Sequence, residues 1–190
     1  MSGTRRMAAV IFPGMGYHTD KPLLYYGKKL AKQHGYEIIE VSYRDLKKEP
    51  NKLEAAFQSA LAQTEELLGG KGLQEYGELL FISKSIGTVV ASAYAEKYSL
   101  FPRHILYTPV EETFSFVPTR GIAFHGTADP MADTEMIRKA CLECHIPLFI
   151  TKCGNHSLET GEALQDLKIL RTVMEQTERY IEMGEAAGFM

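Results

Sequence analysis

The chain has 190 residues, of which 45% are hydrophobic and 24% charged, and its formal net charge is −3. This length and composition predict one globular domain over residues 1–190, and the lack of a basic cluster argues against nucleic acid or an anionic membrane as a partner. Three cysteines, an odd number, argue against a disulfide scaffold and for a reducing compartment. No apolar stretch approaches the ~20 residues of a membrane helix, and the first apolar run stops at Pro13, too early for a signal peptide. We therefore expect a cytoplasmic protein.

The first third of the chain predicts two strands and two helices. Residues 7–12 are an apolar run that ends in a glycine-rich turn, which is typical of a buried strand. A helix follows to about residue 34, with Asp20 placed to cap it and Pro22 in its first turn. Residues 37–43 form the second expected strand. A second helix begins at Asn51, with a capping box, and ends at a Gly-Gly pair.

The rest of the chain continues the alternation. A central strand at 78–84 is followed at once by an amphipathic helix, and later strands are expected at 104–108, 121–125 and 147–153. Further helices are expected from Thr134 and from about residue 161 to 183, whereas residues 109–120 link two strands with no clear helix. Because the strands are continuously apolar and alternate with helices, the sequence predicts an α/β fold. Its form is a three-layer α/β/α sandwich around a mostly parallel six-stranded sheet.

The central strand ends in Ser-x-Ser-x-Gly, and a helix begins immediately afterwards. A strand, a sharp turn and a helix are the context of a nucleophile elbow, which lifts one serine clear of the sheet edge. Ser85 is the serine in that position, and small residues two before and two after it let strand and helix approach closely. Gly87 meets that need fully, and Ser83 meets it less well than a glycine would.

Reactive side chains follow several of the predicted strands. Ligands of open α/β sheets bind outside the carboxyl ends of the strands, so the residues just past each strand are the candidates for a site. A serine follows the third strand, an aspartate the fifth and a histidine the sixth, namely Ser85, Asp129 and His156. We therefore expect these three side chains to lie at one edge of the sheet.

In these residues the sequence resembles the α/β-hydrolase superfamily, whose catalytic residues follow the same chain order, serine, acid, histidine. The resemblance covers most of the chain, from Met7 to about Ile181. It implies that Ser85 is the nucleophile, His156 its base and Asp129 the group that orients the imidazole. It also implies an oxyanion hole formed by the backbone N–H groups of Met15 and Ile86.

The chemistry requires these residue types. A serine hydroxyl is a poor nucleophile unless a base removes its proton during attack, and a histidine has a pKa near working pH. We expect the substrate to contact residues that follow the first and fourth strands: Gly14, Tyr17, His18, Thr108 and Glu111. We expect no metal and no cofactor.

The sequence departs from the superfamily pattern at three points. Ser83 replaces the first glycine of the elbow, Pro13 replaces a common histidine, and the two leading antiparallel strands are missing. The third departure implies a trimmed α/β-hydrolase fold with six strands in the order 2-1-3-4-5-6. Only residues 109–120 occupy the place of a cap, so we expect an open site.

Other interpretations of single residues stay open. Asp133 and Glu111 are alternative acids, although Asp133 is also placed to cap the helix that starts at Thr134. Lys84 is a rival base beside the serine. Cys141 and Cys144 have the spacing of a redox pair but share the apolar face of a helix, which favours core packing. A metal site formed by these two cysteines with His145 and Cys153 lacks a second paired spacing.

Together these features predict a serine hydrolase that cleaves a small ester or thioester through an acyl-enzyme. Its partner would be a small-molecule acyl substrate, and the oligomeric state is not predicted. The alternative is a non-catalytic protein that binds a small molecule on the same scaffold.

Overall fold

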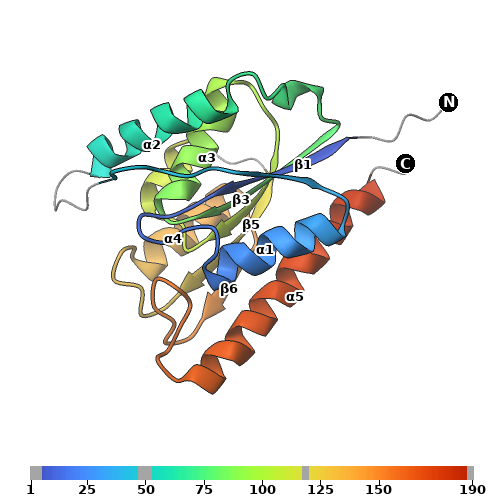
Figure 1. Cartoon of the computed structure of the whole chain (residues 1–190). Helices are drawn as coiled ribbons and strands as arrows, with labels where there is room; N and C mark the ends of the chain where they lie inside the picture. The colour runs from blue at the N-terminus through green and yellow to red at the C-terminus, as the bar shows by residue number, and fades with distance from the viewer. Residues whose placement is uncertain (1–5, 47–52, 117–119, 188–190) are drawn as a thin grey trace.

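The computed structural model describes residues 6–46, 53–116 and 120–187 (Figure 1). Within these residues, six strands form one sheet: β1 (Met7–Phe12), β2 (Glu37–Glu40), β3 (Glu78–Lys84), β4 (Arg103–Tyr107), β5 (Gly121–Gly126) and β6 (Leu148–Thr151). The described part of the chain also forms five α-helices: α1 (Pro22–Gln33), α2 (Leu53–Leu68), α3 (Ile86–Lys97), α4 (Thr134–Glu143) and α5 (Ala163–Ala187). Two short 3-10 helices are η1 (Leu73–Glu75) and η2 (Glu111–Phe116).

The strands lie in the order β2-β1-β3-β4-β5-β6, and each neighbouring pair is parallel. This confirms the six-stranded parallel sheet and its predicted order. The central strands are buried on both faces, so their side chains alternate between two apolar layers. In β3, for example, Leu80 and Ile82 face one layer, while Leu79 and Phe81 face the other.

Helices cover both faces of the sheet. α1 and α5 lie side by side on one face, and α2, α3 and α4 cover the other (Figure 1). The first ten residues of α3, from Ile86 to Ala95, are all buried, so this helix is the core of its layer. The central strand β3 and the buried helix α3 meet at Ser85, which fixes the position of that serine in the fold.

Several local expectations differ from the structure. Asp20 does not cap α1, because Lys21 is the N-cap residue and Asp20 instead pairs with Lys28 at 3.2 Å. β2 ends at Glu40, three residues earlier than expected, and α5 continues past the expected end to Ala187. The segment 109–120, expected to have no clear helix, contains η2. The capping box predicted at Asn51 begins outside the described residues.

Candidate active site

The turn between β3 and α3 holds Ser85 in an unusual backbone conformation, with φ 56° and ψ −128°. Non-glycine residues rarely adopt such angles, and they persist where the surrounding structure enforces them. The close approach of Gly87 to β1 contributes to this: a Cβ there would lie 2.4 Å from the Pro13 carbonyl oxygen. Ser83 is fully buried, and its hydroxyl donates to the Ile105 carbonyl on β4 (3.2 Å).

The loop after β5 and the loop after β6 are joined by backbone contacts. A Cβ on Gly126 would lie 2.2 Å from the Gly154 carbonyl oxygen. The two backbone segments can therefore approach this closely only with glycine at position 126. The Ala128 N–H donates to the Gly154 carbonyl (2.9 Å), and the Cys153 N–H donates to the Thr127 hydroxyl (2.8 Å). These contacts fix the loop that carries Asp129 against the loop that carries His156.

The loop that carries His156 is also held internally. The Asn155 side-chain oxygen accepts from the N–H groups of Ser157 (2.7 Å) and Glu159 (3.1 Å), which curls the loop around it. The Thr108 hydroxyl, at the end of β4, donates to the His156 carbonyl (3.0 Å). The backbone of His156 is therefore anchored from two directions.

The structure brings Ser85, His156 and Asp129 into one hydrogen-bonded chain. His156 Nε2 lies 2.7 Å from Ser85 Oγ, and His156 Nδ1 lies 2.9 and 2.8 Å from the two carboxylate oxygens of Asp129. The Asp129 side chain is fully buried, whereas 19% of the His156 side chain is exposed. The imidazole therefore bridges a buried carboxylate and a hydroxyl at the sheet edge.

The charge of Asp129 is set by its neighbours. Burial on its own would raise the pKa of this carboxyl, but the hydrogen bond from His156 and one from the Met131 N–H (2.8 Å) outweigh it, so the pKa is lowered. The group is thus a carboxylate at neutral pH and can only accept hydrogen bonds. His156 must then carry its proton on Nδ1, which leaves Nε2 as an acceptor for the Ser85 hydroxyl.

The loop after β1 packs directly on the elbow. A Cβ on Gly14 would lie 3.2 Å from both the Lys84 carbonyl oxygen and Ser85 Cβ. Gly14 and Tyr17 exchange backbone hydrogen bonds of 3.0 and 3.1 Å, which closes the loop into a tight turn around Met15. Ile86 is the first residue of α3, where backbone N–H groups have no partner within the helix.

The other residues expected to contact substrate lie in different surroundings. Tyr17 is buried, and its hydroxyl accepts from the Leu23 N–H (3.1 Å). His18 is exposed, 3.9 Å from Asp20. Thr108 is buried against the loop that carries His156, and Glu111 is exposed at the start of η2. Contact with substrate remains a prediction for all of them and for Gly14.

The residues considered above as an alternative acid, base or redox group make other contacts in the structure. Asp133 caps α4 by accepting from the N–H groups of Glu135 (2.9 Å) and Met136 (3.0 Å), as predicted. Lys84 is buried, with Nζ 4.8 Å from the centre of the Tyr17 ring. Cys141, on the buried face of α4, is a free thiol, and burial raises its pKa to about 12, which disfavours the reactive thiolate.

Sequence analysis missed the residues that hold the loops in place. The Met131 N–H, Gly126 and Gly154 all fix Asp129 or His156, yet none was singled out. The available signal was the position of the two glycines, one at the end of a strand and one two residues before His156. His125 also lies against Asp129, with Nδ1 3.9 Å from Oδ2.

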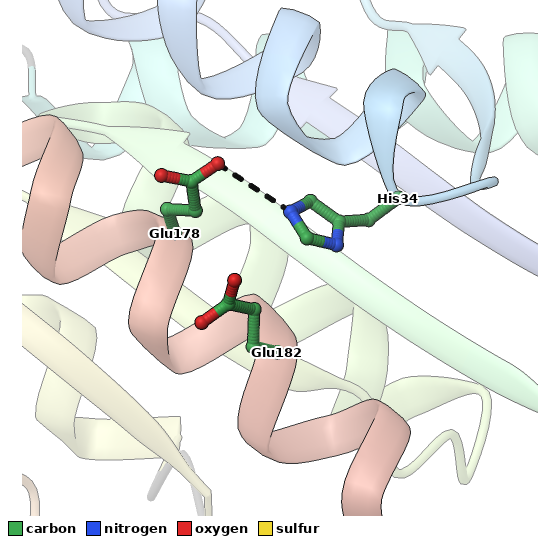
Figure 2. A group of neighbouring side chains, drawn as sticks. All are labelled: His34, Glu178 and Glu182. Atoms are coloured by element: carbon green, nitrogen blue, oxygen red, sulfur yellow. Dashed lines mark ion pairs between the residues drawn. The ribbon is translucent and has the colours of Figure 1, made fainter.

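Figure 2 shows a group that could hold a divalent cation, formed by His34, Glu178 and Glu182. Their ligand atoms lie within 4.8 Å of one another, and one imidazole with two carboxylates suits a metal such as zinc. It is the one such group found in the described part of the chain. His34 lies just before the start of β2, at the amino-terminal edge of the parallel sheet, whereas Ser85 follows the carboxyl end of β3, so the group is remote from the candidate active site.

No family model matches the sequence, and no curated protein matches it. Solved structures do match, and they define the chain's class: this is the α/β-hydrolase fold, with no lid among the residues that the structure describes. A protein of unknown function from Agrobacterium tumefaciens has a TM-score of 0.68 at 16% identity, with 96% of this chain and 86% of that one covered.

Two other matches have more informative names. XC6422 from Xanthomonas campestris, a member of the α/β serine hydrolases without a lid, has a TM-score of 0.66 at 15% identity, over 93% of this chain and 83% of that one. The Pyrococcus furiosus esterase Pf2001 has a TM-score of 0.65 at 10% identity, over 94% and 84%. At these identities the likeness establishes the fold.

Among the described residues, no helix combines the length and apolarity needed to cross a membrane.

Proposed function

We propose that this protein is a serine hydrolase that cleaves a small ester or thioester through an acyl-enzyme, with Ser85, His156 and Asp129 as the catalytic triad. One observation carries the proposal: His156 Nε2 is 2.7 Å from Ser85 Oγ while His156 Nδ1 is hydrogen-bonded to the buried carboxylate of Asp129. A nucleophile, a base and an orienting group within hydrogen-bond reach are the arrangement that activates a serine.

In the proposed first step, Ser85 Oγ attacks the carbonyl carbon of the substrate while His156 Nε2 takes the hydroxyl proton. The tetrahedral intermediate collapses, His156 gives the proton to the leaving alcohol or thiol, and the acyl group stays on Ser85. Water then attacks the acyl-enzyme with His156 again as the base, and the carboxylic acid is released. The ionised Asp129 stabilises the imidazolium that forms in each half-reaction.

The negative charge on the substrate oxygen would be held by the backbone N–H groups of Ile86 and Met15. Ile86 is the first residue of α3, so its N–H and the helix dipole both favour an anion there. Met15 lies in the tight turn that Gly14 brings against the elbow. Each donor of this kind typically contributes about 10²–10³-fold to turnover.

A small acyl substrate fits the surroundings of Ser85. Among the described residues, the segment at the place of a cap holds only the short η2, so we expect no large lid to enclose a long substrate. A peptide is a poorer candidate than an ester, because nothing in the sequence marks a peptide-binding groove. The name of Pf2001, an esterase of the same fold, agrees with this choice.

A fluorophosphonate probe tests the proposal, because it reacts covalently with an activated serine. The wild-type protein should be labelled once, and Ser85→Ala should remove the labelling. Ser92→Ala is the matched control: Ser92 is a buried serine on α3 whose hydroxyl has no partner in the described structure, so this variant should label normally. Short-chain p-nitrophenyl esters and acyl thioesters would then separate the two substrate classes.

A folded wild-type protein that does not label would contradict the proposal. The alternative, a non-catalytic protein that binds a small molecule on this scaffold, would then be favoured. Labelling that survives in Ser85→Ala would show that another residue is the nucleophile.

A further inference from the structure

A second buried histidine lies behind Asp129. His125, on β5, has a fully buried side chain, and its Nδ1 is 3.9 Å from Asp129 Oδ2. Its Nε2 lies 3.0 Å from the hydroxyl of Thr134, the first residue of α4. Nδ1 itself has no hydrogen-bond partner in the described part of the structure. Two imidazoles therefore flank one carboxylate, His156 in direct contact and His125 at a greater distance.

The surroundings of His125 keep it neutral. Burial lowers the pKa of His125, and the nearby Asp129 only partly opposes this effect. The other charged or titratable groups that act on it are His156, from the loop after β6, and Asp133 and Arg138, from α4. At neutral pH the ring therefore carries a single proton, on one nitrogen or the other.

The neighbours of the two ring nitrogens select the position of that proton. The Thr134 hydroxyl can donate or accept, whereas the Asp129 carboxylate can only accept. A proton on Nδ1 points the positive end of an N–H dipole at the carboxylate, and Thr134 then donates to Nε2. The other tautomer would point a lone pair at the carboxylate. At 3.9 Å the contact is a charge–dipole attraction rather than a hydrogen bond, and both side chains are fully buried, so bulk solvent screens it little.

We propose that His125 is a positioning residue for the candidate triad, which turns its Nδ1–H toward Asp129 and so helps to hold the carboxylate ionised and oriented on His156. The inference rests on the proposed function, since it assigns His125 a role in the same proton transfer. His125 touches neither the serine nor the substrate, and it acts only through Asp129.

Removing His125 should change the pH dependence of the reaction. An N–H group that points at a carboxylate stabilises its negative charge. Without the His125 N–H, the Asp129 carboxylate should therefore attract the proton on His156 more strongly. His156 must be unprotonated to act as a base, and the acid-side midpoint of labelling should therefore move to higher pH. For His125→Phe we expect a shift of roughly half a pH unit. His125→Asn keeps an N–H donor near the position of Nδ1 and should restore most of the wild-type midpoint.

His104 supplies a matched control. It lies on the neighbouring strand β4, is 2% exposed, and its Nδ1 also has no partner in the described structure. Its ring packs against Phe81, with 5.7 Å between ring centres, at the opposite end of the strand from the site. His104→Phe therefore makes the same chemical change to a buried histidine without touching Asp129.

The experiment measures the rate of fluorophosphonate labelling against pH for the wild type, His125→Phe, His125→Asn and His104→Phe. Long-range ¹H–¹⁵N spectra of the wild-type protein at neutral pH read the tautomer of His125 directly. We expect a protonated Nδ1, an upward shift in His125→Phe alone, and a wild-type midpoint in His104→Phe. An unprotonated Nδ1, or a His125→Phe profile that matches His104→Phe, overturns the inference.

The two proposals fail in different ways. If the wild type does not label, the proposed function fails, and the spectrum still decides whether His125 points its proton at Asp129. If the wild type labels and the midpoint of a folded His125→Phe does not move, only the role of His125 fails. If His125→Phe does not fold, the tautomer spectrum decides, because it needs no variant.

Discussion

Strand β3 connects two buried polar clusters that are built on different principles. At its beginning, the Glu78 carboxylate accepts from the Tyr36 hydroxyl and from Arg103 Nη1 (3.1 Å), and Arg103 also donates to the Ile181 carbonyl (3.1 Å). At its end, Ser85 meets His156, which is backed by Asp129. The first carboxylate is paired with a permanent charge, and the second with an imidazole that gains and loses a proton. The contrast separates a cluster that holds the fold together from one suited to proton transfer.

The size of a nearby cavity does not distinguish the candidate active site from the structural cluster at Glu78. A cavity of about 470 Å³ opens beside the first cluster, lined in part by Glu78, Arg103 and Arg120. It lies at the amino-terminal ends of the strands, away from Ser85. Arg103 is packed so tightly against α5 that a Cβ on Gly184 would lie 1.6 Å from its Nη1. The chemistry of the side chains, rather than the volume beside them, therefore locates the candidate active site.

Asp129→Asn should have the largest effect of the changes that test this comparison. The amide can donate to His156 Nδ1, so the imidazole would be held in the wrong tautomer for removing the Ser85 proton. We expect ester hydrolysis to fall by about 10⁴-fold while the protein stays folded. Initial rates on a short-chain ester, with circular dichroism as the folding control, measure this. A loss below tenfold would mean that Asp129 has no such role.

Glu78→Gln should lower the stability of the fold and leave the reactivity of Ser85 unchanged. It leaves the Arg103 guanidinium, whose side chain is 5% exposed, without its carboxylate. Removing one partner of a buried ion pair typically costs about 3–5 kcal/mol of stability. We therefore expect a large drop in the free energy of unfolding in urea and unchanged labelling per folded molecule. If labelling falls in proportion to the loss of stability, the two ends of β3 are not independent.

His104 tests a buried titratable group on β4, where it is paired with Phe81 at the middle of β3. Burial lowers the pKa of His104 from 6.5 to about 4 in the folded protein. Between these values the unfolded chain binds a proton that the folded protein does not, so wild-type stability should fall as the pH drops from 6.5 to 4. The full loss is about 3 kcal/mol. His104→Phe should lack this component, and urea unfolding across that range measures the difference. If the free energies of unfolding of the wild type and His104→Phe depend on pH in the same way, the assigned role of His104 is wrong.

The sheet and the convergence of the three side chains were accessible from sequence for one physical reason. Continuously apolar runs separated by helices specify parallel strands, and parallel strands end at a common edge. Ser85, Asp129 and His156 each follow a strand, so their proximity follows from the topology. Their roles in catalysis remain a proposal, because proximity alone does not establish a reaction.

Contacts between backbones were not accessible in the same way. The approach of Gly126 to Gly154 depends on the three-dimensional path of two loops that are remote in sequence. Asp20 was expected to cap α1 from local pattern alone, but Lys28 offers it an ion pair instead. In both cases a contact beyond the immediate neighbours in sequence decides what a short sequence window cannot.

Ser83→Gly should have the smallest effect, and it tests whether the elbow needs the glycine that the superfamily pattern has at this position. The change removes the hydrogen bond from Ser83 to the Ile105 carbonyl and adds backbone freedom to a strand, so stability should fall by about 1 kcal/mol. The backbone conformation of Ser85, with its positive φ, is held instead by the close approach of Gly87 to Pro13. Labelling should therefore stay close to the wild-type rate. A marked change in rate would show that Ser83 helps to set the elbow, and that the packing of β3 and the reactivity of Ser85 are coupled.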